Sequence, residues 1–354
     1  MSFATLRLHR WLPAALLALL ALGTAAAMAV RDGAAAFGDP VRGAVALALG
    51  SEARCGSYGG LPPGWGAGRH AGMAWIDGGS FTFGSDWGYP DERPAAPGQT
   101  RVAGFWIDQT EVTVAQFSSF VHATGYVTDA ERQGGAVVFH TPSAEELQQR
   151  PLAWWRFVDG ADWRHPRGPD SAVPAPNLPV TLVTQADALA YARWLGRDLP
   201  TEAEWEYAGK AGRDDGKELD TAPRGADGKP AANYWQGMFP TYDAAADGHP
   251  GLAPVGCYAA NAFRLYDMIG NAWEWTRDPY TGARQPHANG DTAAVLPAAL
   301  RGGGARPAAQ MVIKGGSFLC SPDYCVRYRA SAREAQEADL GAGHIGFRTV
   351  LRKD

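Results

Sequence analysis

Two cysteines near the carboxyl end of the chain carry the first chemical signal. Cys320 and Cys325 lie in the segment Gly-Gly-Ser-Phe-Leu-Cys-Ser-Pro-Asp-Tyr-Cys, and the Ser-Pro-Asp turn between them lets the two thiols converge. Such a pair can form a structural disulfide, act as a redox-active pair or bind a metal ion. Two thiolates without a further Cys or His nearby are too few for structural zinc, whereas they suit copper(I), which soft sulfur ligands select. The spacing leaves all three interpretations open.

Other catalytic arrangements are missing from the sequence. It contains no G-x-S-x-G nucleophile elbow, no H-E-x-x-H zinc motif and no G-x-x-x-x-G-K-[ST] phosphate loop. His165, in Trp-Arg-His-Pro, is a candidate base, although a single His beside Trp and Pro is more typical of a structural hydrogen bond.

Two oxygen-rich segments suggest hard cations. Asn233 and Asp247 bracket Trp-Gln-Gly, and Asp267, Asn271 and Glu274 cluster within residues 265–275. Calcium takes six to eight oxygen ligands and accepts backbone carbonyls, so irregular glycine-rich backbone is a suitable host. The alternative is that these Asp and Asn side chains only cap turns.

The composition describes the scaffold that must position these groups. The chain has 354 residues, of which 44 are Gly, 25 are Pro and 38 are aromatic (13 Trp, 12 Tyr and 13 Phe). We therefore expect a loop-rich globular protein with short elements and aromatic anchors. A net charge of −5 makes nucleic acid a poor candidate partner, and four cysteines are too few for a disulfide scaffold.

The amino-terminal residues 1–30 read as a signal peptide or a membrane anchor. Arg7, His9 and Arg10 precede an uncharged stretch, 11–30, that contains a leucine-rich centre and a small-residue Ala-Met-Ala site. The stretch is also about long enough to span a bilayer. A buried core helix is the remaining alternative. We expect an exported protein, periplasmic or secreted, that meets a membrane only through this segment.

The remaining chain divides into a linker or loosely packed extension, residues 31–72, and a single α+β domain, residues 73–354. Helical spacing is expected over residues 113–123 and from Thr184 onward, and Thr201 with Glu204 fits a capping box that opens a short helix. Short strands are expected at 74–76, 80–83, 104–108, 311–313 and 345–350.

Several blocks together resemble one family, the formylglycine-generating enzymes or sulfatase-modifying factors. The resemblance runs from Met73 to Arg348, about four fifths of the chain. It rests on five blocks: Trp163-Arg164-His165-Pro166, Leu199-Pro200-Thr201-Glu202-Ala203-Glu204-Trp205, Asn233-Tyr234-Trp235-Gln236-Gly237, Gly270-Asn271-Ala272-Trp273-Glu274-Trp275 and Lys314-Gly315-Gly316-Ser317. The fold it implies is a loop-rich α+β domain related to the C-type-lectin-like architecture, with little regular secondary structure.

The resemblance also implies an activity. Family members bind copper(I) between two cysteines at this spacing. With dioxygen and a thiol reductant they convert a cysteine in the Cys-x-Pro-x-Arg segment of an unfolded or nascent sulfatase polypeptide to Cα-formylglycine. By similarity, Cys320 is expected to be the more exposed thiolate and Cys325 the more fixed ligand. Ser317, Tyr324 and Trp273 match residues lining the copper and oxygen pocket.

The two oxygen-rich segments match two structural calcium sites of the family. By that similarity, the first comprises Asn233, Asp247 and the carbonyls of Tyr234 and His249. The second comprises Asp267, Glu274 and the carbonyls of Gly270 and Ala272.

The chain also departs from the family pattern. Ala192, Ala330 and Thr349 stand where animal members have half-cystines, so the scaffold is expected to depend on packing and calcium. Cys55 and Cys257 have no family role, and Cys257 is expected to be a buried thiol. An insertion between Tyr280 and Met311 leaves the substrate open. Alternatives are an exported member that modifies another peptide or a metabolite precursor, and a non-catalytic C-type-lectin-like binding module.

Overall fold

The computed structural model describes residues 47–94, 99–213, 223–282 and 309–353, which belong to one compact unit beginning at Val45. The expected signal or anchor segment and most of the expected insertion lie outside these residues. Within the described ranges, no helix is both long and apolar enough to cross a bilayer.

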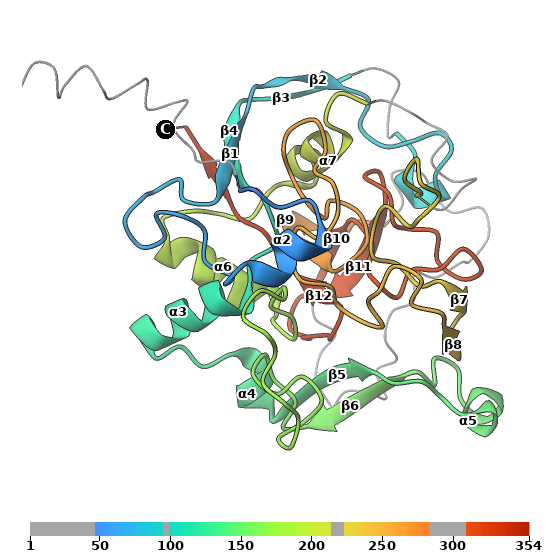
Figure 1. The fold of residues 1–354 in the computed structure, drawn as a ribbon. Helices are drawn as coiled ribbons and strands as arrows, with labels where there is room; N and C mark the ends of the chain where they lie inside the picture. Colours follow the sequence, from blue (N-terminus) through green and yellow to red (C-terminus); the bar gives the residue numbers. More distant parts are fainter. Residues whose placement is uncertain (1–46, 95–98, 214–222, 283–308, 354) are drawn as a thin grey trace, which may run out of the picture. The chain divides into compact units, whose positions relative to one another are not determined.

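A four-stranded sheet lies at the centre of this unit, in the order β11-β10-β9-β12 (Figure 1). Its antiparallel pairs are β9 with β10 and β10 with β11, whereas β12 runs parallel to β9. The strand expected at 311–313 is confirmed, whereas the one expected at 345–350 is divided into residues 345–346 in this sheet and residues 350–352 in another. The bounds are β9 Trp273–Pro279, β10 Gln310–Lys314, β11 Arg333–Glu337 and β12 Ile345–Gly346.

A second, antiparallel sheet has the order β1-β4-β13, and three two-stranded ribbons complete the strands described. The sheet contains β1 Met73–Ile76, β4 Phe105–Asp108 and β13 Val350–Arg352. The ribbons pair β2 Gly79–Phe81 with β3 Thr100–Val102, β5 Gly135–Phe139 with β6 Trp155–Asp159, and β7 Gly237–Met238 with β8 Tyr242–Asp243.

The helices begin where hydroxyl residues can cap them. Thr113, Thr184 and Thr201 each accept a hydrogen bond from the third helical amide, which confirms the expected capping box at Thr201. Helices α6 and α7 pack against β9. The bounds are α2 Glu52–Ser57, η1 Pro90–Glu92, α3 Val114–Thr124, α4 Asp129–Gln133, α5 Ala144–Gln149, α6 Gln185–Trp194 and α7 Glu202–Lys210.

Aromatic side chains join these elements into one core. Phe117 of α3 lies at a ring separation of 6.0 Å from Tyr191 of α6, 5.2 Å from Trp163 and 6.4 Å from Phe347. All four are buried. Rings of this size bury much apolar surface per residue, so short elements and long loops can still enclose a packed interior. The expectation of a loop-rich α+β domain with aromatic anchors is confirmed.

Residues 47–72, expected to belong to a loose extension, instead pack against the domain. Leu47 and Leu49 are each 7% exposed, and Cys55 forms a disulfide with Cys257. The Thr113 hydroxyl also donates to the carbonyl of Gly60 at 2.6 Å. The expected buried thiol at Cys257 is therefore wrong, and the scaffold does not depend on packing and calcium alone. These contacts join residues far apart in sequence, so local periodicity could not indicate them.

We expect the Cys55→Ser/Cys257→Ser variant to lose about 2–5 kcal/mol of unfolding free energy, because a cross-link over 202 residues restricts the unfolded chain. Urea denaturation with and without reductant measures the loss. Reductant should destabilise the wild type and leave the variant unchanged. Equal stability of the two proteins without reductant would contradict a stabilising role.

Candidate functional site

Cys320 and Cys325 are free thiols with their sulfur atoms 3.3 Å apart. They lie on a hairpin after β10, which Ser321 closes by exchanging backbone hydrogen bonds with Cys325 at 3.0 and 3.1 Å. Gly316, between β10 and Cys320, needs to be a glycine: its φ is +80°, and a Cβ there would lie 2.5 Å from the carbonyl oxygen of Arg327. The structure therefore brings the two predicted thiols together without joining them.

The exposures of the two thiols are the reverse of the expected order. Cys320 is only 2% exposed, whereas Cys325 is partly exposed. Cys320 lies on the inner limb of the hairpin, where its N–H donates to the carbonyl of Ser317 and its own carbonyl accepts from the N–H of Trp235. Cys320 is thus the fixed thiol and Cys325 the accessible one.

Each thiol shifts the pKa of the other. Burial alone would raise the pKa of Cys320, but hydrogen bonds from the Cys325 thiol and the Ser317 backbone outweigh it, so this pKa is lowered. The same thiol–thiol hydrogen bond, followed by burial, raises the pKa of Cys325 well above its ordinary value. The directions of the two pKa shifts give Cys320 the thiolate character expected of it and leave Cys325 the more readily protonated thiol.

The other predicted pocket residues have different environments. Ser317 is buried, and its hydroxyl accepts from the N–H of Leu319 at 3.3 Å. Trp273 is buried in the same core cluster as Cys320. Tyr324 is 45% exposed, and its ring stacks on Phe239 at 4.5 Å. The described contacts do not join the Trp273 ring or the Tyr324 hydroxyl to the sulfur atoms, so their roles remain predictions.

A polar strap from the amino-terminal half, residues 85–92, packs against the segment that follows Cys325. Tyr89 accepts the N–H of Val326, and Glu92 forms an ion pair with Arg329 at 2.6 Å. Sequence reasoning missed this contact. Its only local signal was an acidic pair in one segment and Arg-x-Arg in another, more than 230 residues away.

His165 is not joined to the thiol pair by any contact among the described residues. The Asp162 carboxylate accepts the N–H groups of both Arg164 and His165, at 2.7 and 2.8 Å, and lies 3.6 Å from the His165 ring. The surroundings match the structural interpretation of this histidine.

The first expected calcium set offers oxygen atoms that suit a cation. The side-chain oxygen of Asn233 is buried without a hydrogen-bond partner. The carbonyl of Tyr234 and the carboxylate of Asp247 converge on the side-chain amide of Gln236. The His249 N–H donates to the same carboxylate at 2.9 Å. An orphaned buried oxygen at Asn233, with a carboxylate and a carbonyl that converge on Gln236, offers the oxygen donors that calcium takes.

The second expected calcium set fits a cation poorly. Both oxygens of Glu274 have partners: Arg348 binds them at 2.7 Å each, and the Trp205 indole donates to one at 2.6 Å. Asp267 accepts the N–H of Gly256. Throughout the described ranges, three or more His, Cys, Asp or Glu side chains nowhere gather as a metal-holding group.

More carboxylates than one surround the buried guanidinium of Arg348. Burial, together with the charge of Asp267, raises the pKa of Glu111 well above its usual value. Burial likewise raises the pKa of Asp267. Glu111, Asp267 and Glu274 share the one buried guanidinium of Arg348, and Glu274 pairs with it directly. Proton uptake by Glu111 or Asp267 relieves the repulsion among the three carboxylates.

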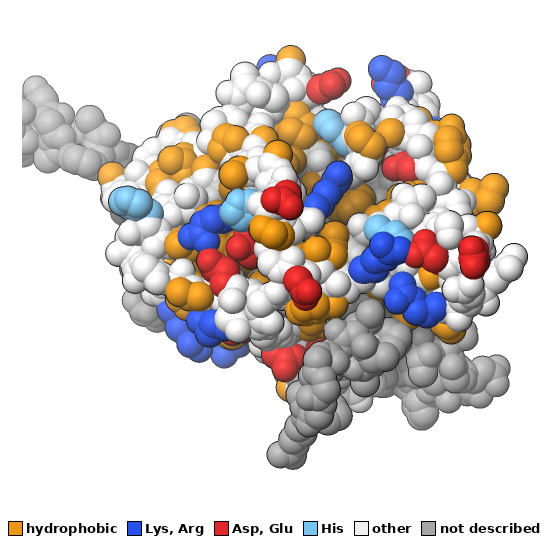
Figure 2. Space-filling view, turned by 90° about the horizontal axis from the view of Figure 1, so that it is seen from below, with side chains coloured by type: hydrophobic (Ala, Val, Ile, Leu, Met, Phe, Trp, Pro, Cys, Tyr) orange, Lys and Arg blue, Asp and Glu red, His pale blue; other side chains and the backbone are white. Residues whose placement is uncertain are grey.

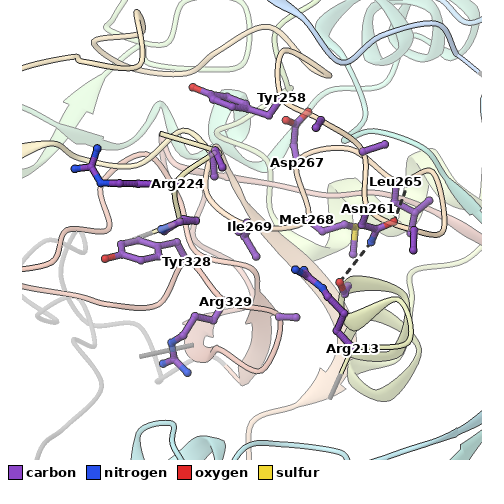
Figure 3. A pocket seen from close by; sticks show the side chains of 18 residues that line it. Arg213, Arg224, Tyr258, Asn261, Leu265, Asp267, Met268, Ile269, Tyr328 and Arg329 are labelled. Carbon is purple, nitrogen blue, oxygen red and sulfur yellow. Dashed lines mark hydrogen bonds between the residues drawn. The ribbon is translucent and has the colours of Figure 1, made fainter. Parts of the chain in front are cut away.

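A pocket of about 660 Å³ is lined in part by Tyr328 and Arg329, which follow the thiol hairpin in the sequence (Figure 3). Tyr258, Asp267 and Tyr328 line it, together with Arg213 and Arg224, and neither Cys320 nor Cys325 does. Figure 2 looks onto the side where β5 and β6 lie and shows hydrophobic side chains interspersed with charged ones. The free thiols therefore lie outside the lining of this pocket.

The family comparison decides what kind of domain carries this hairpin. A model of the "Sulfatase-modifying factor enzyme 1-like domain" matches residues 63–353. The chain belongs to the sulfatase-modifying factor family. The resemblance found in the sequence motifs is therefore confirmed.

Individual members of the sulfatase-modifying factor family are similar over most of this chain. A formylglycine-generating enzyme from Mycobacterium tuberculosis is 44% identical over 299 residues, covering 78% of this chain and 96% of its own. One from Thermomonospora curvata is 42% identical over 292 residues, covering 78% and 92%. An inactive Cα-formylglycine-generating enzyme 2 from Bos taurus is 34% identical over 297 residues, covering 80% and 89%. Membership in the family therefore does not by itself establish activity.

A solved structure shows the same fold. PvdO from Pseudomonas aeruginosa aligns with a TM-score of 0.51 at 24% identity, covering 78% of this chain and 93% of that chain. At this identity the likeness concerns the fold alone.

We expect Glu274→Gln to cost about 3–5 kcal/mol of unfolding free energy, because it leaves the buried Arg348 charge without its partner. The matched control is Glu204→Gln, which breaks a partly exposed pair with Arg352 and should cost about 1 kcal/mol or less. Urea denaturation with calcium and with a chelator measures both. A loss confined to the calcium-loaded protein would instead place a cation at Glu274.

Proposed function

We propose that this protein oxidises a cysteine of a sulfatase polypeptide to Cα-formylglycine. The observation that carries the proposal is the pair of free thiols, Cys320 and Cys325, held 3.3 Å apart on a hairpin with one thiol accessible. Support also comes from the relatives that are named formylglycine-generating enzymes. The sulfatase would be bound in its unfolded or nascent form, because an extended segment of it could approach the partly exposed Cys325.

The thiol pair has the donor chemistry that copper(I) prefers. Two soft sulfur atoms converge, and among the residues that the structure describes no third Cys, His, Asp or Glu completes a metal-holding group with them, which favours copper(I) over a structural zinc ion. Bound copper(I) would supply the electron transfer to dioxygen that side chains cannot perform. Cys320 would hold it from the buried side and Cys325 from the accessible side, where the substrate cysteine would approach.

The overall reaction balances with an external reductant. The substrate CH₂–SH group and O₂, with two electrons and two protons, give an aldehyde, H₂S and water. Dioxygen accepts four electrons, of which the substrate carbon provides two and a thiol reductant the other two. The C–S bond breaks, and the carbonyl oxygen replaces it. Orienting the substrate thiol beside the hairpin would contribute much of the rate advantage.

Three neighbours of the thiols have roles in this proposal. The Ser317 hydroxyl accepts a backbone N–H and retains its own proton to donate into the site. Burial raises the pKa of Tyr324 to about 12, so its phenol stays protonated and can donate a hydrogen bond. Trp273, buried beside the same core, would exclude water.

We further propose calcium at the first oxygen set and export of the protein. Calcium would satisfy the orphaned oxygen of Asn233 while binding Asp247 and the carbonyls of Tyr234 and His249. Export is supported by the disulfide between Cys55 and Cys257, since such bonds persist in oxidising compartments. The uncharged segment at residues 11–30 supports the same route.

The test of the oxidase proposal uses a peptide containing Cys-x-Pro-x-Arg, incubated aerobically with reductant and copper-loaded protein. Mass spectrometry should show the aldehyde with the wild type. Cys320→Ser and Cys325→Ser should each lose at least a hundredfold in rate, because each removes one of the two sulfur ligands.

Matched peptides sharpen this test. A peptide with Ser in place of Cys should not react, and peptides lacking the Pro or the Arg should react more slowly. Conversion that survives in both cysteine variants, or no conversion by wild-type protein with verified copper, would contradict the proposal.

For calcium, we expect the ion to raise the wild-type Tm and to leave the Tm of Asp247→Asn almost unchanged. The gain is about 2.7 kcal/mol when calcium is at a hundred times its Kd. Thermal denaturation with calcium against chelator measures it, with Asp243→Asn, on the neighbouring β8, as the control. Equal calcium-dependent shifts in Asp247→Asn and the wild type would remove calcium from this set.

A further inference from the structure

The residue directly after the accessible thiol is held at both of its backbone polar groups by side chains. The N–H of Val326 donates to the Tyr89 hydroxyl at 3.3 Å, and its carbonyl accepts from the Arg329 guanidinium at 2.7 Å. No strand includes Val326, so these bonds replace the ladder that would otherwise fix its backbone. Because Val326 is bonded to Cys325, its position limits where the Cys325 sulfur can lie.

Tyr89 is itself fixed by two arginines that follow the thiol hairpin. The guanidinium carbon of Arg327 lies 4.4 Å from the centre of the Tyr89 ring, and that of Arg329 lies 5.6 Å from it. Such cation–π contacts hold the ring between the two guanidinium groups. Tyr328, between the two arginines, packs elsewhere against Tyr234. Every second side chain from Arg327 to Arg329 therefore contacts the strap.

Buried carboxylates orient the arginines and the strap together. Glu92 is fully buried, accepts the N–H of Tyr89 at 2.9 Å and pairs with Arg329 at 2.6 Å. Asp91 pairs with Arg327 at 3.1 Å. The strap closes on itself, because the N–H of Ser85 donates to the carbonyl of Glu92. Buried charge pairs of this kind are costly to break, so they hold Tyr89 in one place.

We infer that Tyr89 is a positioning residue for Cys325, and that its hydroxyl sets the separation of the two thiols by fixing the Cys325–Val326 peptide. The inference rests on the proposed function, in which both thiols hold copper(I). Neither the phenol ring nor the arginines need to touch the substrate for this role. A displacement of about 0.5 Å at a ligating atom is enough to weaken such a site.

The test uses Tyr89→Phe, which keeps the ring between the two arginines and removes only the hydroxyl. The N–H of Val326 then loses its hydrogen-bond partner. We expect faster hydrogen exchange at the Val326 amide and severalfold faster alkylation of Cys325 by iodoacetamide in metal-free protein. Copper(I) affinity, measured by competition with a colorimetric chelator, should fall roughly tenfold.

Turnover should change in one parameter only. With the sulfatase peptide, kcat of Tyr89→Phe should fall roughly tenfold while KM stays near the wild-type value, because substrate binding is untouched and thiol placement is not. The control is Tyr207→Phe, on α7. It removes a hydroxyl that donates to the carbonyl of Asp77 at 3.0 Å. It should match the wild type in every measurement.

The outcomes separate this inference from the proposed function. Wild-type exchange, alkylation and copper(I) affinity in Tyr89→Phe would overturn the inference. The same would follow if these properties changed equally in Tyr207→Phe, or only in step with a lowered Tm. If Tyr89→Phe alters them at an unchanged Tm while the wild type fails to oxidise the peptide, the positioning role stands and the oxidase proposal falls.

Discussion

A single buried guanidinium joins most of the segments on which the fold depends. Arg348 binds both oxygens of Glu274 and donates to the carbonyls of Asp108 and Tyr266, so it contacts three other segments of the chain. Glu274 also accepts a hydrogen bond from the indole of Trp205, which connects helix α7 to the same group. A charge buried away from water is stable only when its hydrogen-bonding groups have partners. The bonds of Arg348 therefore fix the positions of these segments relative to one another. Short strands can therefore form a stable interior here.

The thiol hairpin extends the same principle to irregular backbone. Its limb at Cys320 is bonded to Ser317 and Trp235, and the residue after Cys325 is bonded to Tyr89 and Arg329. Side-chain hydrogen bonds to Val326 thus fix the backbone beside Cys325, as ladder hydrogen bonds would in a sheet. The two sulfur atoms stay 3.3 Å apart although neither cysteine lies in a strand. The tight turn at Gly316 determines where the hairpin begins.

Local patterns in the sequence were sufficient for the parts of the fold that depend on neighbours. The capping box at Thr201, the helix after Thr184 and the convergence of Cys320 and Cys325 all follow from residues within a few positions of one another. Three features could not be found that way. The Cys55–Cys257 disulfide, the strap at Tyr89 and the reversed exposure of the thiols depend on contacts across 200 residues or more, or on what covers a turn. The Glu274 carboxylate shows the same limit, since its partner Arg348 lies 74 residues further along the chain.

The chain holds one cysteine pair oxidised and the other reduced, and burial explains how both can persist. Thiol–disulfide exchange requires a thiolate to reach a sulfur atom, so access decides which pair reacts. Cys55 is 1% exposed and Cys257 is 9% exposed, whereas Cys325 is partly open to solvent. A reductant added to serve the thiol hairpin therefore meets Cys325 long before it reaches the disulfide. The disulfide can stabilise the scaffold while the hairpin thiols stay reduced, because the two pairs differ in access more than in chemistry.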